Sequence, residues 1–136
     1  MKTTVQKIAT AYAVLSLLKV NELDKKDKIA LVKISNKMKS VANDLDEFRN
    51  EAMKRISPEG FDEIAYKVQA KANITPAEML TFVKVDKDLA ECMKEEQEKE
   101  VELDIKPLKD SVLEKLIDSN PDLTVGQAEI IYDFLT

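Results

Sequence analysis

The most regular pattern of apolar positions lies in residues 26–56. Apolar side chains recur there at alternating intervals of three and four residues: Leu31, Ile34, Met38, Val41, Leu45, Phe48 and Ala52. A repeat of about 3.5 residues keeps one stripe of a helix facing a neighbour along its length. The pattern predicts one helix about 46 Å long, in an elongated molecule. We refer to its apolar stripe from Leu31 to Phe48 as the interaction seam, because it is expected to face a partner.

A shorter amphipathic helix is expected before the long one. In residues 4–20, Val5, Ile8, Tyr12 and Leu15 follow helical spacing and predict one buried face. The polar stretch over residues 21–28 is short enough to join antiparallel helices. The N-terminal part of the chain therefore predicts a helical hairpin.

Helix start signals recur in the rest of the chain. Ser57 with Pro58 predicts an N-cap and a first helical residue, while Thr75 with Glu78 and Thr124 with Gln127 form capping boxes. Residues 107–119 add another stretch of helical apolar spacing. We expect shorter helices over residues 58–73, 75–99 and 107–119 and from residue 124 onwards.

Residues 100–106 break the helical period. Val101, Leu103 and Ile105 alternate with the acidic Glu102 and Asp104, which indicates a strand. No second segment shows comparable alternation, so one hypothesis is that these residues pair with another copy of the chain. The alternative is an extended segment lying across helices with its apolar side chains inward. The predicted fold class is mainly α, with at most one short strand.

Length and charge suggest how the helices are organised. The 136 residues fit a single helical domain. Residues 1–57 hold 12 basic and 7 acidic side chains, whereas residues 58–136 hold 9 and 19. We therefore expect a basic helical hairpin over 1–57 and an acidic helical part over 58–136. Opposite charges favour contact between the two parts, within one chain or head-to-tail between copies, although two solvated faces of one domain are the simpler interpretation.

Composition argues against enzyme chemistry. The chain has no histidine, which removes the commonest general base and metal ligand. The single thiol, Cys92, lies among carboxylates that disfavour its thiolate, and the two glycines are too far apart for a phosphate loop. We expect no catalytic residue, no metal site and no cofactor. A single cysteine cannot form an intrachain disulfide, so a cytoplasmic setting is expected. The apolar run over residues 8–18 is too short to span a bilayer and lacks a signal cleavage site, so it is interpreted as a buried helix.

The lysine-rich part of the chain is the strongest candidate for ligand chemistry. Within residues 19–39, Lys26, Lys33 and Lys37 are candidate anion contacts, for a phosphorylated ligand or for nucleic acid. Only two arginines, no tryptophan and a pI near 4.9 oppose broad attraction to nucleic acid.

Two runs of residues carry a resemblance. The lysine-rich helix is followed by the run Ser57-Pro58-Glu59-Gly60-Phe61-Asp62-Glu63-Ile64, and Glu100-Val101-Glu102-Leu103 precedes a terminal pair of helices. With the apolar first helix, this arrangement resembles small, mostly helical proteins of tailed phages and prophages, particularly those of Bacteroides-type hosts. The similarity covers most of the chain. It implies a phage context and assigns no catalytic or binding residue.

Three functions are consistent with these patterns. The leading hypothesis is a non-enzymatic assembly protein that forms homo-oligomers or binds a phage or host protein, in the host cytoplasm or in the virion. The alternative is an accessory anti-defence protein that binds a host nucleotide or another anion. The third is a DNA-associated regulator.

Overall fold

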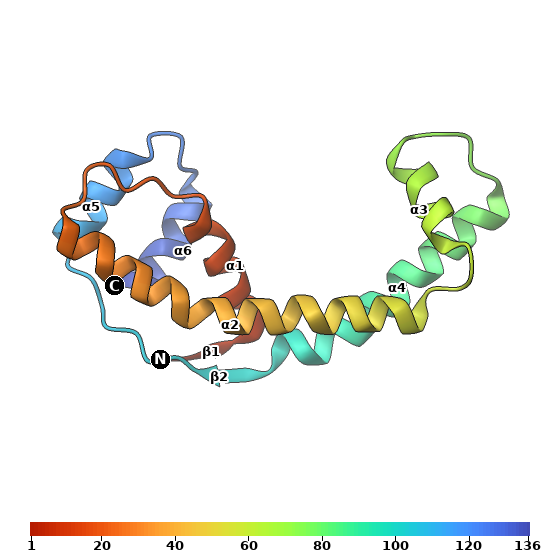
Figure 1. Ribbon diagram of the computed structural model, residues 1–136, viewed down its shortest axis with the longest axis horizontal. Coiled ribbons are helices and arrows are strands. Elements are labelled where there is room, and N and C mark those ends of the chain that lie inside the picture. The colour runs from red at the N-terminus through yellow and green to blue at the C-terminus, as the bar shows by residue number, and fades with distance from the viewer. The chain divides into compact units, whose positions relative to one another are not determined.

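The computed structural model describes all 136 residues as six helices and a two-stranded sheet (Figure 1). In chain order the elements are β1 (Lys2–Thr4), α1 (Val5–Ser16), α2 (Lys25–Ile56), α3 (Phe61–Gln69), α4 (Pro76–Glu98), β2 (Glu100–Glu102), α5 (Asp110–Ser119) and α6 (Val125–Leu135). The mainly helical class, the long second helix of 32 residues and the shorter C-terminal helices are confirmed. None of the helices combines the length and the apolar character that crossing a membrane requires.

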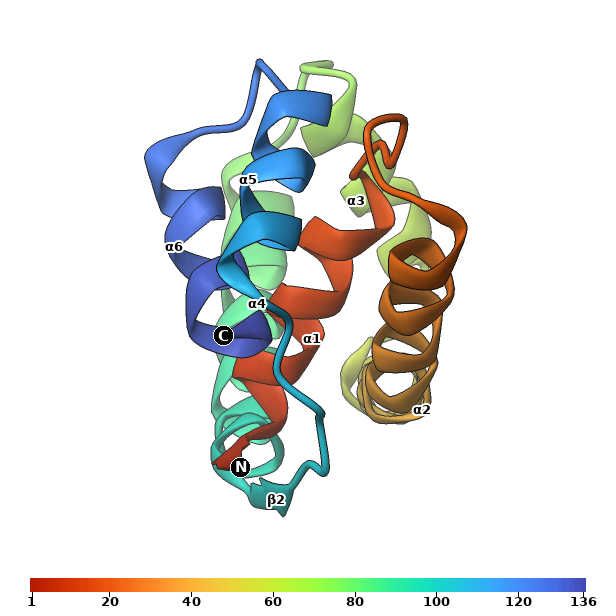
Figure 2. The ribbon, with the colours of Figure 1, turned by 90° about the vertical axis from the view of Figure 1, so that its left-hand side faces the viewer.

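The chain divides into two compact units. The terminal unit comprises Met1–Leu45 and Glu98–Thr136, and the central unit comprises Asp46–Gln97. Within the terminal unit, β1 pairs with β2, and α6 packs against both α1 and α5 (Figure 2). This division differs from the expected basic and acidic parts, because the last third of the chain packs with the first third.

Side-chain caps define several helix starts. Thr4 accepts a hydrogen bond from the backbone N–H of Lys7, and the predicted capping boxes begin α4 at Thr75 and α6 at Thr124. These caps satisfy backbone donors that lack a partner within the helix.

Two predicted helix starts are wrong. The helix expected from residue 107 begins only at Asp110, after Lys109 as its N-cap. Ser57 ends α2, since its N–H donates to the carbonyl of Met53 at 2.9 Å, and α3 begins only at Phe61. Gly60 precedes α3 with φ +80°, a conformation that favours glycine. Pro58 therefore lies in the turn before α3 and is not its first residue.

The strand over residues 100–106 has its partner within the same chain. β2 pairs antiparallel with β1, with Val101 opposite Thr3. The N–H of Leu103 extends the pairing by donating to the carbonyl of Met1 at 2.8 Å. The expectation that the chain has no second strand, on which pairing with another copy was based, is therefore wrong for Val101 and Leu103, and the pairing does not reach Ile105. Leu103 is buried and Ile105 is half-buried, as an inward-facing segment requires.

The interaction seam is largely covered by the chain itself. Leu31, Ile34 and Met38 belong to the apolar core of the terminal unit, together with Ile8 and Leu116. Leu45 is also buried, whereas Val41 and Phe48 are half-buried. The prediction that the seam stays open to a partner is wrong for its four buried residues, Leu31, Ile34, Met38 and Leu45. Residues of α1 and α5, which are distant from α2 in the sequence, share this core and cover the stripe.

The loop before α2 is tied to the end of α5. The side chain of Asn120 accepts from the N–H of Lys19 and donates to the Lys19 carbonyl, both at 2.8 Å. The hydroxyl of Ser119 accepts from the N–H of Glu22 at 2.9 Å. These bonds hold the beginning of α2 beside α5, where the candidate site lies.

Candidate anion-binding groove

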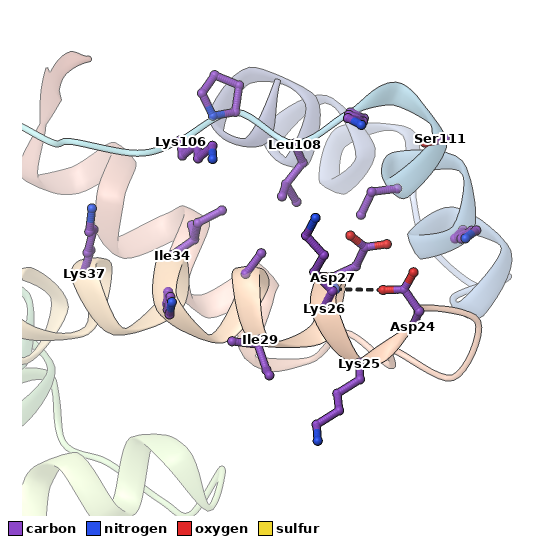
Figure 3. Close-up of a pocket in the computed structure, with 16 residues that line it drawn as sticks. Asp24, Lys25, Lys26, Asp27, Ile29, Ile34, Lys37, Lys106, Leu108 and Ser111 are labelled. Carbon is purple, nitrogen blue, oxygen red and sulfur yellow. Dashed lines mark hydrogen bonds between the residues drawn. The ribbon is translucent and has the colours of Figure 1, made fainter.

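A groove of about 1000 Å³ lies in the terminal unit, between the first part of α2 and the segment that leads into α5 (Figure 3). We call it the lysine groove. Its lining residues are Asp24, Lys25, Lys26, Asp27, Ile29, Ala30, Lys33, Ile34, Lys37, Lys106, Pro107, Leu108, Lys109, Ser111, Val112 and Lys115. The volume is at the upper end of the range for small-molecule sites.

Lysines occupy both walls of the groove. The α2 wall contains all three predicted anion contacts, Lys26, Lys33 and Lys37, because spacings of seven and four residues place side chains on one helix face. The opposite wall adds Lys106, Lys109 and Lys115. These three lysines were not among the predicted anion contacts, since they lie in the acidic part of the chain and no local pattern connects them with α2.

The bottom of the groove is apolar. Figure 3 shows the side chain of Ile34 rising from α2 while that of Leu108 descends from the opposite wall. Lys26 and Lys37 extend from α2 toward the same space, whereas Lys25 points away from it. Ala30, Pro107 and Val112 complete the apolar lining. We call Ala30, Ile34, Pro107, Leu108 and Val112 the groove floor.

Carboxylates line only the end of the groove at the start of α2. Asp24 accepts a hydrogen bond from the N–H of Asp27 at 2.9 Å, and this bond lowers the pKa of the Asp24 carboxyl. The nearby charges of Lys115 and Lys26 lower that pKa further. Asp24 is therefore ionised at neutral pH and offsets positive charge at this end.

Positive charge is less compensated toward the other end. None of the groove lysines forms an ion pair, but Asp24 lies near enough to Lys115 and Lys26 to feel their charge, whereas Lys33 and Lys106 have no lining carboxylate beside them. Lys37 donates to the backbone carbonyl of Asp104, a neutral acceptor. Converging ammonium groups repel each other, and an anion between them would relieve that repulsion.

The polar side chains of the groove suit binding better than catalysis. They are lysines, two aspartates and the hydroxyl of Ser111. Lysine supplies a mobile point charge with three donors, which can neutralise a phosphate or a carboxylate. The arrangement offers several such charges above an apolar surface.

A second and smaller cavity of about 650 Å³ lies beside β1, α1 and α6. Its lining residues are Met1, Lys2, Thr3, Gln6, Lys7, Thr10, Ile130, Asp133 and Phe134. Two lysines and one aspartate give it far less charge than the lysine groove. The lysine groove is therefore the stronger candidate site.

No family model, curated protein or solved structure matches this chain.

Proposed function

We propose that this protein is a non-enzymatic binding protein that holds an anionic ligand in the lysine groove. The convergence of lysines from two distant segments on one groove carries the proposal. None of the seven lysines that line the groove has an ion-pair partner, and the groove is large enough for a ligand. A host nucleotide is one such anion, and a role in a phage-infected cytoplasm is part of the same proposal.

Charge reversal in the groove tests this function. We expect inorganic triphosphate to bind saturably in isothermal titration calorimetry. The double variant Lys33→Glu/Lys106→Glu should weaken that binding at least about tenfold, because one attraction on each wall becomes a repulsion. Both side chains are exposed, so the fold should tolerate the changes.

The matched control is Lys28→Glu/Lys39→Glu. Lys28 and Lys39 are exposed on the same helix but do not line the groove. This control has the same change in net charge and should retain wild-type affinity. A flat titration of the wild-type protein, or equal weakening in both double variants, would contradict the proposal. Strongly salt-dependent binding to duplex DNA would instead favour a DNA-associated regulator.

Self-association is the second candidate function, and an exposed apolar surface on α4 favours it. Met79, Leu80 and Val83 are 40%, 72% and 54% exposed and share one side of the helix. Because most of the interaction seam is covered, these residues offer a better contact for a second copy. We expect sedimentation equilibrium to detect an oligomer at tens of micromolar and Leu80→Ser/Val83→Ser to shift it toward monomer. A wild-type protein that stays monomeric would exclude this function under those conditions.

A further inference from the structure

The lysine groove presents two kinds of surface to one ligand. Its floor consists of apolar side chains, whereas both walls end in ammonium groups. A compact phosphate would contact the lysines and leave the accessible part of the floor, at Ala30, Pro107 and Leu108, in water, while Ile34 and Val112 are already buried in the core. A ligand that contacts the whole groove needs an apolar side for the floor and negative charge on both flanks. Protein interfaces commonly have this arrangement of an apolar centre and a polar rim.

The spacing of the lysines on α2 indicates the form of that ligand. From Lys26 to Lys37 the helix rises about 16 Å, and the intervals of seven and four residues follow helical periodicity. A second helix lying along α2 repeats its side chains with the same period. Carboxylates at matching intervals on such a helix would meet Lys26 and Lys33 in succession, and would meet Lys37 in exchange for its hydrogen bond to the Asp104 carbonyl.

The opposite wall supplies matching contacts for the other flank. Lys106 and Lys109 flank Leu108 in the sequence and line the groove with it, and the side chain of Leu108 points toward α2 (Figure 3). An apolar ridge seated on the accessible floor residues Ala30 and Leu108 would therefore have lysines of both walls beside it. The long lysine stems can cover the edges of that ridge while their ammonium groups remain in water.

We propose that the ligand of the lysine groove is an acidic amphipathic α-helix of a partner protein. Its apolar side would pack on the groove floor, and its glutamates or aspartates would flank that side toward the lysines of both walls. This is recognition of a helix in a groove, in which apolar anchors contribute affinity and flanking charges set orientation. The inference depends on the proposed anion-binding function and narrows it to one class of partner.

A pair of synthetic peptides tests this inference by fluorescence anisotropy. The first, about three heptads long, carries leucine at positions a and d and glutamate at e and g, the positions that flank the apolar side. The control peptide has the same composition, but its glutamates are moved to b and f on the far side. We expect the first peptide to bind at least about tenfold more tightly than the control.

Three variants of the protein complete the experiment. Lys33→Glu/Lys106→Glu should weaken binding of the first peptide at least about tenfold, and Lys28→Glu/Lys39→Glu should leave it unchanged. Leu108→Ala should weaken the peptide severalfold while triphosphate binding stays at the wild-type level, because only the peptide contacts the floor. Retained triphosphate binding also shows that the groove remains folded in this variant.

The outcomes separate this inference from the function on which it depends. Equal affinity for the two peptides would overturn the helix inference. So would a peptide affinity that is the same for the wild-type protein and for Lys33→Glu/Lys106→Glu. If triphosphate still binds through Lys33 and Lys106 in that case, the anion-binding function stands. If neither peptide nor triphosphate binds, both proposals fail.

Discussion

Replacing Met38 with alanine is expected to lower the free energy of unfolding by about 3 kcal/mol. Met38 is fully buried at the middle of the interaction seam, within the apolar core of the terminal unit. Truncation removes buried methylene groups and leaves a cavity that the surrounding helices can fill only in part. Urea unfolding followed by circular dichroism measures the loss. It should be independent of protein concentration, because residues of the same chain provide the burial.

The same substitution at Met79 serves as the control. Met79 is 40% exposed on α4, so Met79→Ala should change stability by less than about 0.5 kcal/mol. A loss at Met38 that grows as the protein is diluted would mean that a second copy completes the seam. If Met38→Ala lowered the free energy of unfolding as little as Met79→Ala, the result would contradict the burial of Met38.

Replacing Phe61 with alanine should destabilise the central unit by about 3 to 4 kcal/mol. Phe61 is only 4% exposed, and its ring stacks on that of Phe82 with a centroid separation of 6.1 Å. The substitution removes a large buried area and the contact between the two rings. Hydrogen exchange measured by mass spectrometry should therefore accelerate over residues 46–97.

Tyr66→Ala on the same helix is the control for Phe61→Ala. Tyr66 is 71% exposed, and its truncation should leave exchange in the central unit close to wild type. We expect residues 1–45 and 98–136 to retain their protection in Phe61→Ala, because compact units can open separately. Equal acceleration throughout the chain would show instead that the two units unfold together.

The helices could be predicted because their signals are local. The heptad spacing from Leu31 to Phe48 indicated α2, and Thr75 with Glu78 indicated the start of α4. The start of α3 was misplaced because Ser57 and Pro58 form a plausible cap and first residue. The turn through Gly60, with its positive φ, shifts the actual start to Phe61.

Half of the candidate site was visible in the sequence. Lys26, Lys33 and Lys37 share a helix face, and their spacing is sufficient to show it. The opposite wall was not predictable, because the alternation that ends at Lys106 and the helical spacing that includes Lys109 do not indicate which distant segment these lysines face. Their place beside α2 depends on the pairing of β2 with β1 and on the bonds from Asn120 to Lys19.

Local patterning alone accounts for the mainly helical character of the chain, its long second helix and the three lysines on one side of it. Backbone hydrogen bonds within a helix join residues four apart, so short-range spacing and caps are enough to specify them. Tertiary structure decided what covers the interaction seam, which segment pairs with Val101 and which lysines face α2. Several of these contacts join residues about one hundred positions apart in the sequence. Their energy comes from burial of apolar side chains and from strand pairing, which cannot be recognised from the residues of one short segment.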